Sequence, residues 1–178
     1  MKRTGSSKEH YRFTSVLEQS TNKLWGAHVR VPTRIATELK ERNVRRVVCS
    51  LNGSSEFQTA ILPYKTGVFV IRVNKSLRDK LGLDFGSKVS VVLHKDVSKY
   101  GLPLPDEFKE LLRQDKEGNR LFHALTLGKQ RTLLYIIGKG KDMDLRIAQG
   151  IIIINHLKAN NGAINYRRLS ASLKALHH

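Results

Sequence analysis

Basic side chains are the residues of this chain whose number and spacing most clearly suggest chemistry, and that chemistry is the binding of anions. The 178 residues include 32 lysines and arginines against 15 aspartates and glutamates, which gives a formal net charge of +17. A field of this sign attracts polyanions, nucleic acid above all. Eight cations are expected to contact phosphate groups along one face of a folded domain: Arg30, Arg34, Arg45, Arg46, Arg72, Lys75, Arg78 and Lys88.

Arg30 and Arg72 are the centre of this first set. Each is followed by a valine that is expected to point into a core, so the alternation of a strand directs both arginines outward. Contacts of such arginines with a phosphate backbone would bind DNA or RNA with a steep salt dependence and little sequence selectivity. The alternative interpretation is a charged strand exterior that protects the sheet and keeps the protein soluble.

A second basic set lies in the C-terminal part of the chain and consists of Lys129, Arg131, Lys139, Lys141 and Arg146. These cations would extend an anion-binding surface beyond the first set. The alternative is that Lys139 and Lys141 merely follow the end of a helix, where its dipole favours positive charge.

The remaining reactive side chains form no recognisable catalytic or metal-binding pattern. Cys49 is the single cysteine and takes the place of a valine in a repeated strand, so we expect a small buried hydrophobe and not a reactive thiol. The histidines are scattered without the spacing of a metal motif. Asp142 and Asp144 lie two residues apart and would diverge on a helix. We therefore expect no enzymatic activity, no metal and no cofactor.

Two related segments would position the first set of cations. Residues 29–52 align without a gap with residues 71–94, and their apolar positions coincide, although only five of the 24 aligned residues are identical. Apolar residues alternate at both ends of each copy, as in strands, and lie four apart between these ends, as on one face of a helix. Each copy is therefore predicted to be strand, short helix, strand. One such unit leaves an open sheet edge, which two interlocked copies remove.

Further strand signals complete this domain. Residues 11–19 alternate like a strand, Asn52-Gly53 is a strong hairpin signal, and Gly67 marks a return into residues 68–73. We predict about six strands and two capping helices, with Asn74 as the N-cap of the second helix. The predicted fold class is α+β, a small β-barrel formed by one chain with an internal duplication and followed by a small all-α module.

The periodicity changes after residue 98. Pro103 and Pro105 predict an extended linker over residues 99–105, and apolar residues then recur at helical spacing through residues 106–160. Residues 161–178 are interpreted as a tail that forms a loose helix or stays disordered. Residues 1–10 are interpreted as a disordered N-terminal tail.

The same sequence suggests where the protein works. The first ten residues are polar and lack the apolar stretch of a secretory signal, so we expect a cytoplasmic protein. The longest aliphatic run, Ile151 to Ile154, is far shorter than the roughly 20 residues that a membrane span needs. We expect no membrane crossing.

The segment from Phe13 to Asp96 resembles a known family. Its pieces "LWGAHVRVP", "LNG" and "GVFVIRVNKSLRDKLGLDFGSKVSVVL" look like a bacterial domain of unknown function placed among the AbrB/MazE/MraZ-like double-split β-barrels. AbrB, MazE and MraZ are DNA-binding proteins that build the barrel from two chains, whereas this family builds it from one. The resemblance implies a double-split β-barrel over residues 11–98 and leaves the function open.

The segment from Leu104 to Leu157 is similar to the helical bacteriocin-protection module of the YdeI/OmpD-associated family. The run from Gly128 to Arg131 fits the family's GKQR element before a hydrophobic helix. Arg146 keeps part of a later basic motif, whereas Gln149 stands where a second basic residue is expected. The resemblance implies that any ligand held by this motif in relatives is held less well here.

Two functional hypotheses follow from the sequence. The leading one is a non-enzymatic basic binding protein that contacts DNA or RNA through phosphates. The alternative is a protein-interaction or stress- and bacteriocin-protection module, in which the helical part docks an acidic protein partner and the barrel is a scaffold.

Overall fold

Strands with alternating apolar residues build the first of two units into which the chain divides, Met1–Val97 and Ser98–His178. The computed structural model describes residues 10–21 and 26–177, so the predicted disordered tail over residues 1–10 lies outside the described residues except for His10. The described part of the first unit contains seven strands: β1 (Tyr11–Gln19), β2 (Ala27–Val31), β3 (Arg46–Leu51), β4 (Phe57–Ala60), β5 (Leu62–Lys65), β6 (Val68–Val73) and β7 (Lys88–Lys95).

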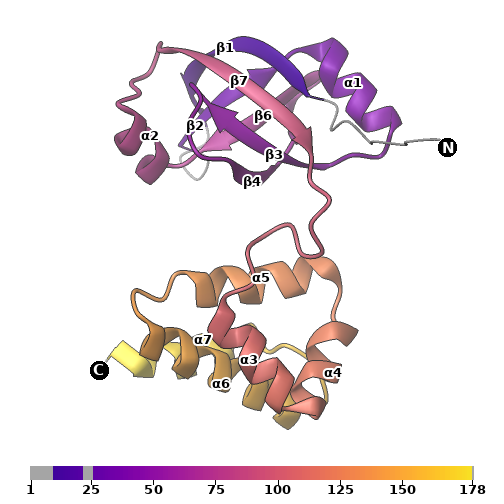
Figure 1. Cartoon of the computed structure of the whole chain (residues 1–178), viewed down its shortest axis with the longest axis vertical. Helices are drawn as coiled ribbons and strands as arrows, with labels where there is room; N and C mark the ends of the chain where they lie inside the picture. The colour runs from indigo at the N-terminus through magenta and orange to yellow at the C-terminus, as the bar shows by residue number, and fades with distance from the viewer. Residues whose placement is uncertain (1–9, 22–25, 178) are drawn as a thin grey trace, which may run out of the picture. The chain divides into compact units, whose positions relative to one another are not determined.

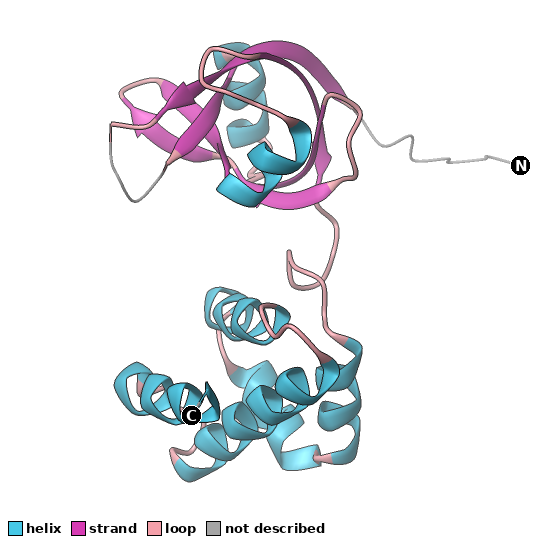
Figure 2. Ribbon diagram, turned by 90° about the vertical axis from the view of Figure 1, so that its left-hand side faces the viewer, coloured by secondary structure: helices cyan, strands magenta, loops and turns pink. Residues whose placement is uncertain are grey.

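These strands form one antiparallel sheet in the order β4-β3-β7-β1-β2-β6-β5. The two end strands, β4 and β5, are consecutive in the chain and are separated only by Ile61. The sheet therefore curls strongly, and Figure 2 shows its barrel-like form. The sequence predicted about six strands; the structure has seven because the run over residues 57–65 is divided at Ile61.

Two helices of the first unit follow the first strand of each copy. Helix α1 (Thr33–Glu41) follows β2, and α2 (Lys75–Leu81) follows β6. Figures 1 and 2 show them at opposite ends of the curled sheet. Asn74 caps α2 as predicted, because its side chain accepts a hydrogen bond of 2.8 Å from the backbone N–H of Leu77. Gly82 ends the helix with a φ of +60°, a conformation that glycine adopts without steric cost.

The strand pairing relates the two copies by an approximate two-fold axis. β2 pairs with β6 so that Val29 lies opposite Ile71, and β3 pairs with β7 so that Ser50 lies opposite Val92. Both pairs join residues 42 positions apart, which is the offset between the two copies in the sequence. The first strands of the copies thus pair with each other at equivalent residues, and so do the second strands.

The same symmetry extends to strands that the sequence did not identify as repeated. Phe13 of β1 lies opposite Val91, just as Phe57 of β4 lies opposite Cys49. Towards the other end, Glu18 lies opposite His28 as Leu62 of β5 lies opposite Val70. Both comparisons relate β1 to the β4–β5 segment by an offset of 44 residues.

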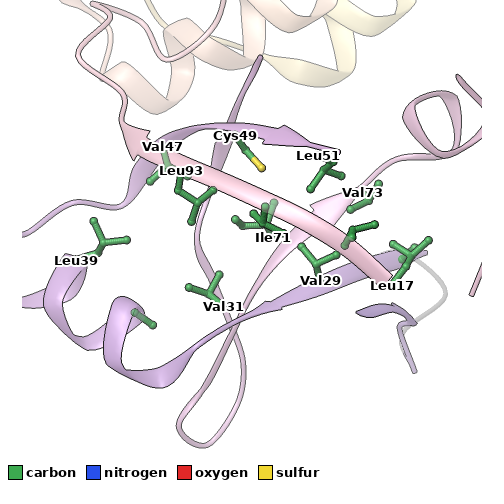
Figure 3. Packing of buried hydrophobic residues seen from close by; sticks show 14 of the residues in the cluster. Leu17, Val29, Val31, Leu39, Val47, Cys49, Leu51, Ile71, Val73 and Leu93 are labelled. Carbon is green, nitrogen blue, oxygen red and sulfur yellow. The ribbon is translucent and has the colours of Figure 1, made fainter. Parts of the chain in front are cut away.

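The interior of the sheet is an apolar core drawn from both copies. Figure 3 shows side chains of β2, β3, β6 and β7 around it, with Cys49 among them. The exposed fraction of Val29, Ile71, Leu93 and Cys49 is 0%. This confirms the inward positions that strand alternation predicted, and it confirms Cys49 as a small buried hydrophobe.

The described part of the second unit is helical. It comprises α3 (Asp106–Gln114), α4 (Lys116–Ala124), α5 (Leu127–Gly138), α6 (Met143–Ala159), α7 (Tyr166–Lys174) and a short 3-10 turn, η1 (Ala175–His177). Phe108, Phe122, Leu133 and Ile153 are among the fully buried side chains of its own core. Among the described residues, none of the helices combines the length and the apolar character that a membrane span requires.

Two segments outside the predicted helical module belong to this core. In the predicted linker over residues 99–105, Tyr100 is 8% exposed and Leu102 and Leu104 pack against the cluster. In the predicted tail over residues 161–178, α7 places Leu169 in the same cluster with 1% of its surface exposed. The second unit therefore begins before the prolines and continues through α7.

Candidate functional site

Four of the eight predicted cations form two pairs related by the approximate two-fold axis. Arg30 on β2 corresponds to Arg72 on β6, and Arg46 at the start of β3 corresponds to Lys88 at the start of β7, each at the offset of 42 residues. We refer to Lys88, Arg30, Arg72 and Arg46 as the cationic line. The exposed members are Arg30, Arg72 and Lys88, and Arg46 is half-buried.

Strand register places the cationic line across the outer surface of the sheet. Arg30 lies opposite Val70 and Arg72 lies opposite His28, so the two arginines are diagonal neighbours on paired strands. The distance expected between the Cα atoms of such residues is roughly 7–8 Å. Lys88 lies opposite Val16 on β1, and Arg46 lies opposite Ala60 on β4. The line thus runs from the start of β7, over the central pair, to the start of β3.

The charge of Arg30 is partly balanced. Its Nε and one terminal nitrogen donate to the two carboxylate oxygens of Glu18 at 2.7 and 2.8 Å. The Arg30 side chain is still 55% exposed. An anion at the outer surface therefore meets an exposed guanidinium that the Glu18 carboxylate holds in one orientation.

The other four predicted cations do not share this surface. Arg34 lies on α1 and Arg45 just before β3, whereas Lys75 and Arg78 lie on α2 at the opposite end of the sheet. Arg78 lies over the ring of Phe85, with its guanidinium carbon 5.1 Å from the ring centroid. The first set is thus divided between one outer surface and two separate ends.

A buried polar cluster that the sequence did not indicate lies beside the cationic line. His28 is 0% exposed, although strand alternation places it on the outer face of β2. Its Nδ1 is 2.6 Å from Ser20 Oγ, its Nε2 is 3.9 Å from a Glu18 carboxylate oxygen, and its ring centroid is 4.4 Å from that of Tyr64. Tyr64 is 36 residues away in the chain, so only the curled sheet brings the two rings together.

The electrostatics of this cluster favour the neutral imidazole. Burial lowers the pKa of His28, and Glu18 opposes this shift. A serine hydroxyl hydrogen-bonded to a histidine nitrogen is also the arrangement in which histidine activates serine as a nucleophile. In this structure Ser20 is only 8% exposed, and 3.9 Å is too long for His28 Nε2 to donate a hydrogen bond to Glu18 that would orient the ring.

A second histidine site lies at the end of β7. His94 is 5% exposed, its Nε2 is 3.2 Å from a carboxylate oxygen of Glu56, and its ring centroid is 5.1 Å from that of His10. Across residues 10–21 and 26–177, no three histidine, cysteine or carboxylate side chains gather in a way that would hold a metal ion.

The second basic set is split between structural and exposed roles. Arg146 donates two hydrogen bonds, of 2.9 and 2.6 Å, to Glu107 Oε1 and a third to the carbonyl of Gly140. The bonds to Glu107 lower the pKa of its carboxyl group and link α6 to α3. Lys129 and Lys139 lie at the two ends of α5, ten residues or about 15 Å apart. The set therefore does not form one cluster.

Comparison with known proteins covers the first unit only. Residues 13–93 match the family model described as a domain of unknown function (DUF1905). No curated protein matches the chain. The matched residues run from the first half of β1 almost to the end of β7, which is the part of the chain that carries the two-fold pairing.

Proposed function

We propose that the first unit is a single-chain double-split β-barrel of the AbrB/MazE/MraZ-like class, and that it binds nucleic acid in the cytoplasm without catalysing a reaction. The observation that carries this proposal is the pairing of β2 with β6, which brings the equivalent residues Arg30 and Arg72 together on the outer surface. A fold class that elsewhere needs two chains would here supply both halves of a binding surface from one.

The cationic line suits phosphates better than base edges. Phosphate contacts need positive charge at a defined spacing and carry no sequence information. The line provides four cations on β7, β2, β6 and β3, and the net charge of +17 draws a polyanion towards the molecule as a whole. Binding with little sequence selectivity and a steep salt dependence is the expected result.

A salt titration with a paired variant tests this function. Arg30→Gln with Arg72→Gln should weaken binding of a fluorescent DNA duplex and reduce the slope of log affinity against log salt by about 2, since each phosphate contact contributes about 0.9. Fluorescence anisotropy from low to moderate salt measures both quantities. Single-stranded DNA and RNA of the same sequence would show which nucleic acid is preferred.

A matched control separates the surface from the net charge. Lys116→Gln with Arg120→Gln also removes two positive charges, but from exposed positions on α4 in the second unit. This control should retain the slope of the unaltered protein. An equal loss of slope in both variants would mean that binding follows total charge, and the assignment to the cationic line would be wrong.

A stripe on α5 favours a second candidate function, the docking of an acidic protein partner by a helical unit of the YdeI/OmpD-associated, bacteriocin-protection type. Leu127, Arg131, Tyr135 and Lys139 follow one another at intervals of four residues, so they share one face. Leu127 and Tyr135 are 53% and 55% exposed, and Lys139 lies 4.4 Å from the Tyr135 ring centroid. A nuclease-treated pull-down in which Tyr135→Ser with Arg131→Glu loses a specific partner would support this function.

A further inference from the structure

A pocket at the α1 end of the first unit has no role in the function proposed above. Its volume is about 540 Å³, within the range of small-molecule sites. Its wall combines α1, the segment after it, the β4–β5 junction and β6. The lining residues are Ala36, Leu39, Lys40, Asn43, Val44, Arg45, Ile61, Pro63 and Phe69.

The approximate two-fold axis shows what makes this end hollow. The equivalent of Ala36, 42 residues on, is Arg78, and the equivalent of Asn43 is Phe85. At the α2 end these two large side chains stack on each other, with 5.1 Å between the guanidinium carbon and the ring centroid. At the α1 end a methyl group and a short amide stand in their places. The two helices thus differ in the bulk of equivalent side chains, and the turns that follow them differ too, because Asn43 has the positive φ (+53°) at one end and Gly82 has it (+60°) at the other.

The α1 end also carries positive charges that the α2 end lacks at the equivalent positions. Lys40 and Arg45 line the pocket, and their equivalents at the other end are Gly82 and Ser87. None of the nine lining residues is acidic. Within the part of the chain that the structure describes, neither Lys40 nor Arg45 makes an ion pair, and both are exposed. Two cations without counter-ions therefore border an aliphatic and aromatic cavity.

We propose that this pocket binds a small amphipathic carboxylate, with its apolar body against Leu39, Ile61 and Phe69 and its carboxylate at Lys40 and Arg45. Burial of an apolar body supplies most of the affinity of such a site, and a few polar groups fix the orientation. Hydrogen bonds between a carboxylate and lysine or arginine are among the stronger ones in proteins. This binding is separate from the contact with nucleic acid.

Octanoate and its neutral analogue octanamide test the proposal on the full chain. The two molecules share an alkyl body and differ in charge. Isothermal titration calorimetry at low salt should give at least about tenfold tighter binding of octanoate. Lys40→Gln with Arg45→Gln should bring the two affinities together, and Lys80→Gln, an exposed lysine of α2, should leave the tenfold difference in place.

A second variant tests the cavity itself. Ala36→Met places a larger apolar side chain in the pocket and should weaken binding of both molecules at least tenfold, with the thermal unfolding midpoint measured to show that the variant is folded. Where this variant fails to fold, Ala36→Leu should still weaken binding of both molecules. Arg30→Gln with Arg72→Gln should leave octanoate binding unchanged, which distinguishes this site from the cationic line.

Three results would overturn the proposal. Equal affinity for octanoate and octanamide would exclude the charge recognition by Lys40 and Arg45. Octanoate binding that survives in the folded, filled variant would place the ligand elsewhere. No binding of either molecule at millimolar concentration would mean that the cavity does not accept an alkyl carboxylate.

Discussion

His28 is the residue at which burial and ionisation conflict most directly. Its ring is 0% exposed, Ser20 contacts Nδ1, and Nε2 is buried without a hydrogen-bond partner. A charged imidazolium would need a hydrogen-bond acceptor at that nitrogen, and the Glu18 carboxylate stays 3.9 Å away. Burial therefore lowers the pKa of His28, and the positive charges of Arg30 and Lys65 act in the same direction.

This lowered pKa predicts a loss of stability in mild acid. The unfolded chain takes up the proton first, at the ordinary histidine pKa of about 6.5, and the folded chain takes it up only at lower pH. The free energy of unfolding should therefore be constant above the unfolded pKa and should fall as the pH drops below it. The slope from one histidine is at most about 1.4 kcal/mol per pH unit. Urea unfolding at a series of pH values above and below about 6.5 measures this slope.

A variant assigns this slope to His28. His28→Gln keeps a polar side chain without a titrating group, so it should flatten the dependence of the unfolding free energy on pH. His156, whose pKa burial also lowers, should keep its own contribution in that variant. An unchanged slope in His28→Gln would mean that His28 does not carry the acid sensitivity.

Sequence predicted single residues well where one local pattern determines the environment. Cys49 takes the place of a valine in the repeated strand pattern, and that alignment predicted its burial. The neighbours of His28 were not predictable in this way. Ser20 precedes a hairpin, and Tyr64 comes from a strand at the sheet edge, so their meeting depends on the curl of the whole sheet.

At the scale of elements, helix α7 is the largest difference from the prediction. Residues 161–178 were predicted to form a loose helix or to stay disordered. The structure has Asn165 as the N-cap of α7, accepting a hydrogen bond of 3.1 Å from the backbone N–H of Arg168, and Leu169 is 1% exposed. Leu169, with Leu173 packed against the same cluster, attaches the helix to the core, and the number of apolar residues in the segment does not predict that.

Leu169→Ala tests whether α7 is a structural part of the second unit. Removing a buried leucine side chain should lower the free energy of unfolding by about 2–5 kcal/mol. Lys174→Ala, at an exposed position of the same helix, should change it by less than about 0.5 kcal/mol. Urea unfolding followed by circular dichroism measures both values. Equally small changes in the unfolding free energy of both variants would mean that α7 is not part of the folded core of the second unit.

The repeat of β1 was missed for a different reason. Its counterpart is divided into β4 and β5 at Ile61, and Pro63 interrupts the second piece. A proline lacks the N–H that a central strand must donate, so the strand pattern of that segment is weak in sequence. The pairing partners are what reveal the equivalence, because β4 and β5 contact β3 and β6 as β1 contacts β7 and β2.

At the scale of the whole molecule, charge and fold place different demands on the chain. The two-fold pairing needs only the apolar positions of the copies, and these were readable from the sequence. The pairing places no such requirement on the exposed positions, and the chain has 17 more positive than negative side chains. Self-repulsion of this excess destabilises a compact state. Ion pairs such as Lys158–Asp115 act in the opposite direction, and each exposed pair contributes only about 0.2–1 kcal/mol.

Salt should therefore stabilise the protein. Screening weakens both the repulsion and the ion pairs, and the repulsion is the larger quantity because most cations have no acidic counterpart. We expect the thermal unfolding midpoint to rise as sodium chloride is added, by about 4–8 °C for each kcal/mol of repulsion relieved in one unit of this size. Lys116→Glu with Lys174→Glu lowers the net charge from +17 to +13 at two exposed positions and should reduce the rise. A midpoint that falls with salt would show that the ion pairs outweigh the repulsion, and the excess charge would then carry no cost in stability.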